Sequence, residues 1–479
     1  MNTRMILRVL GYILLIFAAL MLLPILAALW YRESPLPLLV PLLLAALTGF
    51  LLTRLRPRST TLFARDGFVI VGVGWILMSL LGALPFFLSG ALPGYVDALF
   101  EAASGLSTTG ATVVTDLDSM PRGVLFWRMF THWIGGMGVL VFLMAVLPMS
   151  GEYSMHIFRA EVPGPTVGKL VPKARQTARV LYMIYIALTL LQALFLLLGG
   201  MSFYDALLHA FATAGTGGFS TNPASIAGFH SRYIETVCAV FMLLFGINFN
   251  LYFLLLIGRG WDALKNEELR WYLGIIFGAA LLITFGIRHT YGGFAPAFHQ
   301  AFFNVNTILS TTGFGTVDFT LWPEYCKWIL LLLMVCGGCA GSTGGGMKLS
   351  RLMILGKMIV SELRQMARPR SVQRVEMDGR RVEMSTVKAA AIFAVLYFFL
   401  LMLFSALISL DGTDVATSFT AALSCLSNVG PGMTTIIGPL GSFAFFTPRT
   451  KLLMTLAMLL GRLEFYPILV LLSPRTWKK

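Results

Sequence analysis

Apolar runs of about 20 residues recur along the whole chain, and they constrain its fold more than any other feature. A helix of that length crosses a hydrocarbon layer about 30 Å thick. Hydrophobic residues make up 57% of the 479 positions and only 12% are charged, whereas a water-soluble domain carries about 25% charged residues. Because lipid offers no hydrogen-bond partners, the backbone of each run must bond within itself. We therefore predict an all-α integral membrane protein.

The positions of the runs predict ten transmembrane helices. Two of them come first, and the remaining eight follow as four pairs. The ten predicted spans are about 6–30, 36–53, 68–90, 123–148, 180–199, 233–257, 271–289, 326–362, 388–409 and 450–472.

The net charge of +14 has an explanation that needs no nucleic acid. If the N-terminus is cytoplasmic and each span crosses once, most of the 36 Lys and Arg residues fall on one face of the membrane. Cytoplasmic loops of membrane proteins carry such an excess of positive charge. We predict a multi-pass membrane protein with both termini in the cytoplasm and no soluble enzyme domain of its own.

One unit recurs after the first two spans, and it aligns without gaps when one glycine of each copy is placed in register. Each of these four aligned glycines ends an amphipathic segment of about 12 residues, which is too short to cross a bilayer. Irregular backbone is tolerated at membrane depth only where it lines water or is buried in protein. Four such re-entrant segments around one axis would form a pore with pseudo-fourfold symmetry. The aligned glycines are Gly110, Gly218, Gly313 and Gly430, in segments 97–112, 205–220, 300–315 and 417–432.

This repeat divides the chain into five predicted units: two N-terminal helices followed by four pore repeats. Their predicted boundaries are 1–58, 66–150, 178–260, 270–363 and 386–475.

The glycine-containing loops have the chemistry of a cation filter. A dehydrated K⁺ needs several oxygens in a rigid frame, and backbone carbonyls supply them when the chain turns them inward. Glycine permits the backbone angles that this requires. The opposing interpretation is that the glycines only let helices pack closely. The predicted filter residues are Thr109, Gly110, Gly217, Gly218, Thr312, Gly313, Val429 and Gly430, with Thr108, Thr311 and Asn428 as support.

At this point the sequence resembles a known family, the TrkH-type members of the Trk/Ktr/HKT superfamily of potassium transporters. The resemblance rests on the four repeated segments, on Thr-His-Trp-Ile-Gly-Gly-Met-Gly at 131–138, and on Gly-Gly-Cys-Ala-Gly-Ser-Thr-Gly-Gly-Gly-Met-Lys at 337–348. The two extra N-terminal helices fit TrkH rather than the shorter KtrB. The resemblance implies a homodimer with one pore per subunit and a cytoplasmic TrkA-type nucleotide-binding regulatory subunit. It implies K⁺ as the transported ion and no bound cofactor.

The resemblance also implies that segment 337–348, which we call the glycine-rich loop, is an intramembrane gate below the filter. The sequence supports a break here, because each glycine disfavours a helix interior by about 1 kcal/mol. Lys348 would lie at the cytoplasmic edge or contact the gate. The resemblance places Arg462 near the gate as a barrier to cations, and the alternative is a structural Arg462 bonded to Glu464 or to loop carbonyls. The predicted gate glycines are Gly337, Gly338, Gly341, Gly344, Gly345 and Gly346.

Two motifs in the same region have other interpretations, which we reject. A phosphate-binding P-loop would need Gly-Lys-Ser/Thr, but Met347 separates Gly346 from Lys348. Cys336 and Cys339 form a Cys-Gly-Gly-Cys pair, which we expect to lie inside an apolar helix as packing residues. We see no set of residues for a catalytic site and no spacing for another metal site.

The sequence therefore predicts K⁺ uptake through a gated, channel-like pore. The alternatives are a K⁺ symporter coupled to H⁺ or Na⁺ and, further off, a membrane-embedded enzyme or receptor. No loop carries the Thr-Val-Gly-Tyr-Gly of strict K⁺ channels. Fewer carbonyl layers predict that K⁺ and Rb⁺ are preferred and Na⁺ is excluded only moderately.

Overall fold

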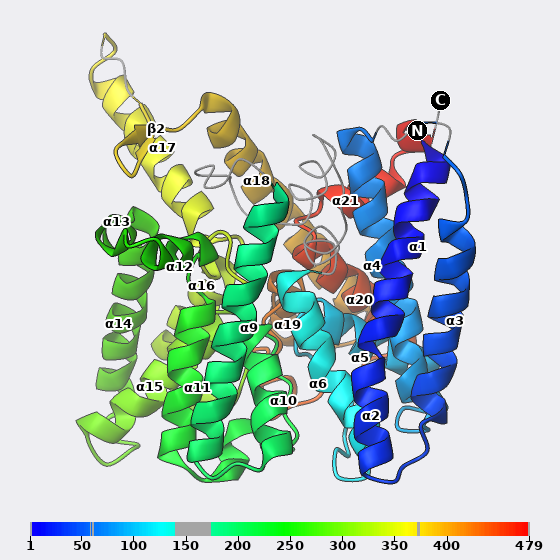
Figure 1. Ribbon diagram of the computed structural model, residues 1–479. Helices are drawn as coiled ribbons and strands as arrows, with labels where there is room; N and C mark the ends of the chain where they lie inside the picture. The colour runs from blue at the N-terminus through cyan, green and yellow to red at the C-terminus, as the bar shows by residue number, and fades with distance from the viewer. Residues whose placement is uncertain (1, 58, 60–61, 139–173, 371–373, 478–479) are drawn as a thin grey trace.

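The computed structural model describes residues 2–57, 59, 62–138, 174–370 and 374–477 (Figure 1). These residues are mostly helical, and their strands form one short antiparallel pair, β1 (Glu376–Met377) and β2 (Arg380–Arg381). The prediction of an all-helical chain with several apolar helices is thereby confirmed.

The N-terminal helices form a close pair on one side of the molecule (Figure 1). They are α1 (Thr3–Leu20) with its continuation α2 (Leu22–Trp30), and α3 (Leu36–Thr53). Two glycines allow the close contact, because a Cβ on Gly11 would lie 2.8 Å from the Gly49 carbonyl oxygen and one on Gly49 would lie 2.9 Å from that of Gly11. Small residues at such crossings let membrane helices approach through their backbones.

The first two repeats follow. Repeat 1 contains α4 (Ala64–Leu88), α5 (Tyr95–Leu106) and α6 (Arg122–Met137). Repeat 2 contains α9 (Ala174–Leu198), α10 (Phe203–Ala214), α11 (Arg232–Phe245), α12 (Phe249–Leu256) and α13 (Gly260–Lys265). Part of the predicted unit 66–150 lies outside the described residues.

The last two repeats have the same order of a long helix, a short helix and a second long segment. Repeat 3 contains α14 (Glu267–Ile287), α15 (Phe294–Leu309), α16 (Glu324–Cys336) and α17 (Leu349–Ala367). Repeat 4 contains α18 (Met384–Ile408), α19 (Val415–Ser427), α20 (Pro448–Arg462), α21 (Tyr466–Leu472) and α22 (Pro474–Trp477). Figure 1 shows α17 extending past the other helices, with the β1–β2 hairpin beside it.

Fewer helices than expected are long and apolar enough to cross a membrane. Within the described residues there are six, or seven if α11 and α12, which bend by 89° at their junction, count as one span. Several predicted spans are broken: α16 ends at Cys336, and α20 ends at Arg462 before two residues with positive φ, Glu464 (53°) and Phe465 (69°). Span 123–148 runs beyond the described residues. The number ten stays a prediction.

Candidate ion pathway

The four repeated segments have the same backbone conformation where the short helices end. The residue two positions before each aligned glycine has a left-handed backbone, with φ of 56° at Thr108, 54° at Thr216, 60° at Thr311 and 55° at Asn428. Such angles are uncommon for threonine, so the surrounding structure must hold them. The aligned glycines themselves have φ of 81°, 76°, 85° and 102° in chain order.

The four glycine turns face one another in a closed cycle. A Cβ on Gly110 would lie 1.9 Å from the carbonyl oxygen of Gly217, and one on Gly218 would lie 2.1 Å from that of Thr312. In the same way, a Cβ on Gly313 would lie 2.1 Å from the Val429 oxygen. The cycle closes because a Cβ on Gly430 would lie 2.8 Å from the Thr109 oxygen. Each glycine thus faces a peptide oxygen of the next repeat, and the predicted filter residues are brought together.

Side chains behind these turns hold the carbonyls in place. In repeats 1 and 3, Ser107 and Ser310 bond the hydroxyls of Thr109 and Thr312, at 2.7 Å in both cases. In repeat 4 the Ser424 hydroxyl donates to the carbonyl of Gly430 itself, at 2.6 Å.

The three predicted support residues differ in what they contact. The Asn428 amide donates to the Thr109 hydroxyl and to the Met458 carbonyl, both at 2.9 Å, so it joins repeats 4 and 1. The Thr311 hydroxyl accepts from the Gly345 N–H at 2.7 Å. The buried Thr108 hydroxyl finds no hydrogen-bond partner among the described residues.

The glycine-rich loop lies directly against the ends of two short helices. It separates α16 from α17, as expected, and Gly337, Gly341 and Gly346 have φ of 70°, 71° and 75°. A Cβ on Gly344 would lie 2.8 Å from the Ser310 oxygen, and one on Gly345 would lie 2.3 Å from the Ser427 oxygen. The loop therefore packs against the glycine turns of repeats 3 and 4 through bare backbone.

Three buried cations bond carbonyls of this loop, and one of them, Arg351, donates to the Met347 carbonyl at 3.3 Å. The Lys348 ammonium, 1% exposed, donates to the Gly344 carbonyl. The Arg462 guanidinium donates to the Thr343 carbonyl at 2.7 Å and to the Gly136 carbonyl at 2.8 Å. Glu464 pairs instead with Arg351, at 2.5 Å. Arg462 thus contacts a carbonyl of the loop, as the structural interpretation expected, and its role as a barrier to cations stays a prediction.

Sequence reasoning missed Glu268, which bonds both the glycine-rich loop and the first turn of α17 that follows it. Its Oε1 accepts from the backbone N–H of Ala340 at 2.7 Å and of Ser350 at 3.1 Å, and the residue is 5% exposed. In the sequence it is one of two acids in the first turn of α14, where acids ordinarily favour the helix dipole. Nothing in that local pattern distinguishes it from its neighbour Glu267.

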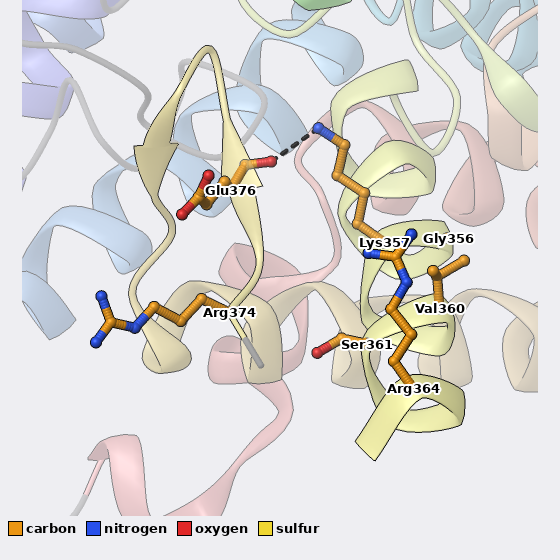
Figure 2. Close-up of a pocket in the computed structure, with 7 residues that line it drawn as sticks. All are labelled: Gly356, Lys357, Val360, Ser361, Arg364, Arg374 and Glu376. Atoms are coloured by element: carbon orange, nitrogen blue, oxygen red, sulfur yellow. Dashed lines mark hydrogen bonds between the residues drawn. The ribbon is translucent and has the colours of Figure 1, made fainter. Parts of the chain in front are cut away.

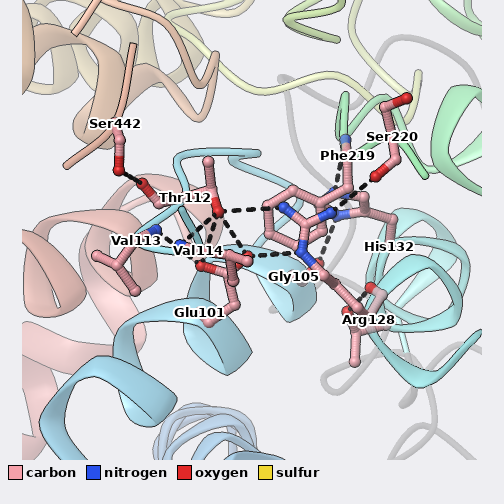
Figure 3. Close-up of polar contacts among 11 residues, drawn as sticks. Glu101, Gly105, Thr112, Val113, Val114, Arg128, His132, Phe219, Ser220 and Ser442 are labelled. Carbon is pink, nitrogen blue, oxygen red and sulfur yellow. Dashed lines mark hydrogen bonds and ion pairs between the residues drawn. The ribbon is translucent and has the colours of Figure 1, made fainter. Parts of the chain in front are cut away.

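A second missed feature is the buried ion pair of Glu101 and Arg128 behind the first glycine turn (Figure 3). In the sequence, the only sign of this pair is that Glu101 and Arg128 are charged residues in otherwise apolar segments, which is unusual at membrane depth.

The cysteine pair differs from our expectation. Cys336 ends α16 and Cys339 lies in the glycine-rich loop, so the prediction that both lie inside a helix is wrong. The glycines that follow Cys336 end the helix. Both thiols are free and buried.

A cavity of about 390 Å³ lies away from the glycine turns, between α17 and β1 (Figure 2). Its Lys357 ammonium bonds Glu267 of α14 at 2.5 Å and the Glu376 carbonyl of β1 at 2.7 Å, so this side chain links α17 to α14 and to the hairpin. The cavity is lined by Gly356, Lys357, Val360, Ser361, Arg364, Arg374 and Glu376.

In the described ranges, no group of three or more His, Cys, Asp or Glu residues could hold a metal ion.

Comparison with known proteins gives consistent matches over the whole chain. The family model TrkH, described as a cation transport protein, matches residues 41–285 and 294–479. The Trk system potassium uptake protein TrkH of Escherichia coli (strain K12) is 36% identical over 487 residues, and the match covers 100% of both chains. The Trk system potassium uptake protein TrkG of the same organism is 34% identical with the same coverage.

A solved structure agrees with these matches. The crystal structure of the potassium transporter TrkH from Vibrio parahaemolyticus superposes with a TM-score of 0.89 and 34% sequence identity, covering 100% of both chains.

Proposed function

Because the chain belongs to the TrkH family of cation transport proteins, we propose that it takes up potassium through a gated, channel-like pore in the bacterial inner membrane. The family consists of transport proteins, which agrees with the prediction that the chain is not an enzyme. Potassium is the ion named for the relatives.

The closed cycle of glycines and peptide oxygens is the observation that carries this proposal. A K⁺ ion gives up its water only where oxygens replace the hydration shell. Four loops that turn one carbonyl each toward a shared axis offer such a layer, and the short helices that end there point their negative ends at it. The oxygens that face the neighbouring aligned glycines are those of Thr109, Gly217, Thr312 and Val429.

The glycine-rich loop is the proposed gate, with Lys348 and Arg462 as its charged residues. Irregular backbone at this depth is tolerated where it lines a water path or is buried in protein. The Gly345 N–H donates to the Thr311 hydroxyl, and this contact of the loop with the glycine turn of repeat 3 supports the assignment. Movement of the loop would open the path, and the positive charges would oppose cations while it is closed.

The remaining assignments rest on the family resemblance, on the distribution of Lys and Arg, and on the repeat in the sequence. We propose a homodimer, a TrkA-type nucleotide-binding regulatory subunit, cytoplasmic termini, and the division into an N-terminal helix pair and four pore repeats. Coupling of K⁺ to H⁺ or Na⁺ is the alternative mechanism.

A growth test with a matched control decides the function. Cells that lack K⁺ uptake should grow in micromolar to low-millimolar K⁺ when they express the chain, and should not grow with Gly313→Asp. Gly356→Asp is the control, because this exposed glycine on α17 has no atom within 4 Å of the place that a Cβ would occupy. Growth with both aspartate variants would contradict the filter, and a flux in liposomes that requires a proton or Na⁺ gradient would favour the coupled mechanism.

A further inference from the structure

Glu101 of α5 and Arg128 of α6 form an ion pair that is shielded from solvent, at 0% and 2% exposure (Figure 3). The Arg128 Nε donates to the Glu101 Oε1 at 2.7 Å. Two charges removed from water stabilise a structure only when their remaining hydrogen-bonding groups are also satisfied. The hydrogen-bond partners of this pair therefore show which segments of the chain it holds in place.

The carboxylate holds the chain that leaves the first glycine turn. The Thr112 hydroxyl donates to it at 2.9 Å, and the Val113 N–H donates to its second oxygen at 3.0 Å. We use the term filter strand for the irregular segment of each repeat that contains its aligned glycine. Thr112 follows Gly110 by two residues, so the carboxylate fixes the end of the filter strand of repeat 1.

The guanidinium reaches the neighbouring repeat. Its Nη2 donates to the Thr112 hydroxyl and its Nη1 donates to the carbonyl of Ser220, each at 3.1 Å. The guanidinium carbon lies 3.6 Å from the centre of the Phe219 ring. Phe219 and Ser220 directly follow Gly218, so Arg128 joins the strand of repeat 1 to the strand of repeat 2.

The other repeats have no such charge at the corresponding position. Nine residues before the aligned glycine stand Glu101, His209, Asn304 and Ala421. His209 bonds the Ser220 hydroxyl at 2.9 Å, Asn304 donates to the Thr316 hydroxyl at 3.4 Å, and Ala421 has no polar side chain. The side chains at this position therefore differ among the four repeats, and only the one in repeat 1 belongs to an ion pair.

We propose that the Glu101–Arg128 pair determines the preference for K⁺ over Na⁺ by fixing the separation of the first two filter strands. This inference rests on the proposed function. A ring of carbonyls that can contract will also coordinate the smaller Na⁺, and a ring whose strands are fixed against each other resists contraction. Glu101, Arg128 and Thr112 are then positioning residues, which act on the ion through the strand that they hold.

Two pairs of variants test the inference. Thr112→Val keeps the ion pair but removes the hydroxyl that links it to the strand, and Thr112→Ser restores that hydroxyl. Glu101→Gln removes the charge, and Asp97→Asn removes an equal charge one turn earlier on α5, where Asp97 pairs with Lys451 at 2.6 Å. Bi-ionic potentials in liposomes should show the K⁺/Na⁺ permeability ratio falling about tenfold in Thr112→Val and Glu101→Gln, which equals about 1.4 kcal/mol between the two ions. Thr112→Ser and Asp97→Asn should keep the ratio near that of the parent.

The outcomes separate this inference from the proposed function. If the parent conducts K⁺ selectively and Gly313→Asp abolishes the flux, the filter stands. An unchanged ratio in folded Thr112→Val and Glu101→Gln would then overturn the role of the pair alone. Failure of both variants to fold, monitored by thermal unfolding in detergent, would also overturn it, because the pair would hold the fold and not the selectivity. A parent without K⁺-selective flux would instead overturn the proposed function.

Discussion

At the residue scale, the aligned glycines are required for two separate reasons. Each has a left-handed backbone, which side chains rarely adopt, and each lacks room for a Cβ because a peptide oxygen of the next repeat occupies that place. A residue such as Gly412 has the first property without the second, since its φ is 77° and no atom lies within 4 Å of a Cβ built there. The two effects can therefore be measured apart.

Gly110→Ala should abolish K⁺ flux, whereas Gly412→Ala should keep it. Both substitutions place alanine at a positive φ, at a cost of roughly 1–3 kcal/mol in the free energy of unfolding. Only the Cβ at position 110 would meet the Gly217 oxygen, at 1.9 Å, and displace the second turn. Flux into liposomes and thermal unfolding of both variants measure this. Equal flux in the two variants would show that the close approach has no role.

At the element scale, the glycine-rich loop is held from several sides by separate helices. Glu268 at the start of α14 bonds Ala340 of the loop and Ser350 just after it, Arg462 at the end of α20 bonds Thr343, and Thr311 after α15 bonds Gly345. Both Glu268 bonds are to backbone N–H groups, so they depend on the course of the backbone and not on its side chains. A carboxylate that joins the loop to the first turn of α17 should stabilise one loop conformation over others.

Glu268→Ala should loosen the loop and raise the basal K⁺ flux several-fold, while Glu267→Ala should leave it near the parent value. The first change leaves the N–H groups of Ala340 and Ser350 without an acceptor, at roughly 1–3 kcal/mol each. The second removes the pair with Lys357 and a bond from the Asp378 N–H, neither of which involves the glycine-rich loop. Flux measured in liposomes without any regulatory subunit compares them. A lower flux in Glu268→Ala would mean that the carboxylate holds an open loop.

At the scale of the whole molecule, the four aligned segments meet in one closed cycle but are unequal. Charge, side-chain length and support differ among them, from the ion pair at Glu101 to the bare Ala421, while the backbone course at the aligned glycines is shared. The N-terminal end of α1 and the helix α21 lie toward the same end of the molecule, where α17 also extends (Figure 1). The molecule thus has one end at which α17, the hairpin and α21 lie (Figure 1).

The purified chain in liposomes should conduct K⁺ and Rb⁺ with similar ease and Na⁺ less readily, by about tenfold. One to two layers of carbonyls discriminate less than a longer filter would, because fewer contacts differ between the ions. Reversal potentials under bi-ionic conditions give the ratios. A current carried by Cl⁻ would contradict the carbonyl ring altogether, since peptide oxygens repel anions.

The sequence by itself determined the membrane class and the residues that meet at the four glycine turns. These follow from local properties, because apolar length and the register of Gly110, Gly218, Gly313 and Gly430 are readable along the chain. Only the tertiary structure decided the partners of the buried charges. Glu268 accepts from backbone N–H groups 72 and 82 positions away, and Arg351 pairs with Glu464, 113 positions away. It also decided where spans break, as at Cys336 and Arg462. Such partners are selected by burial and by contacts between distant segments, which no local pattern encodes.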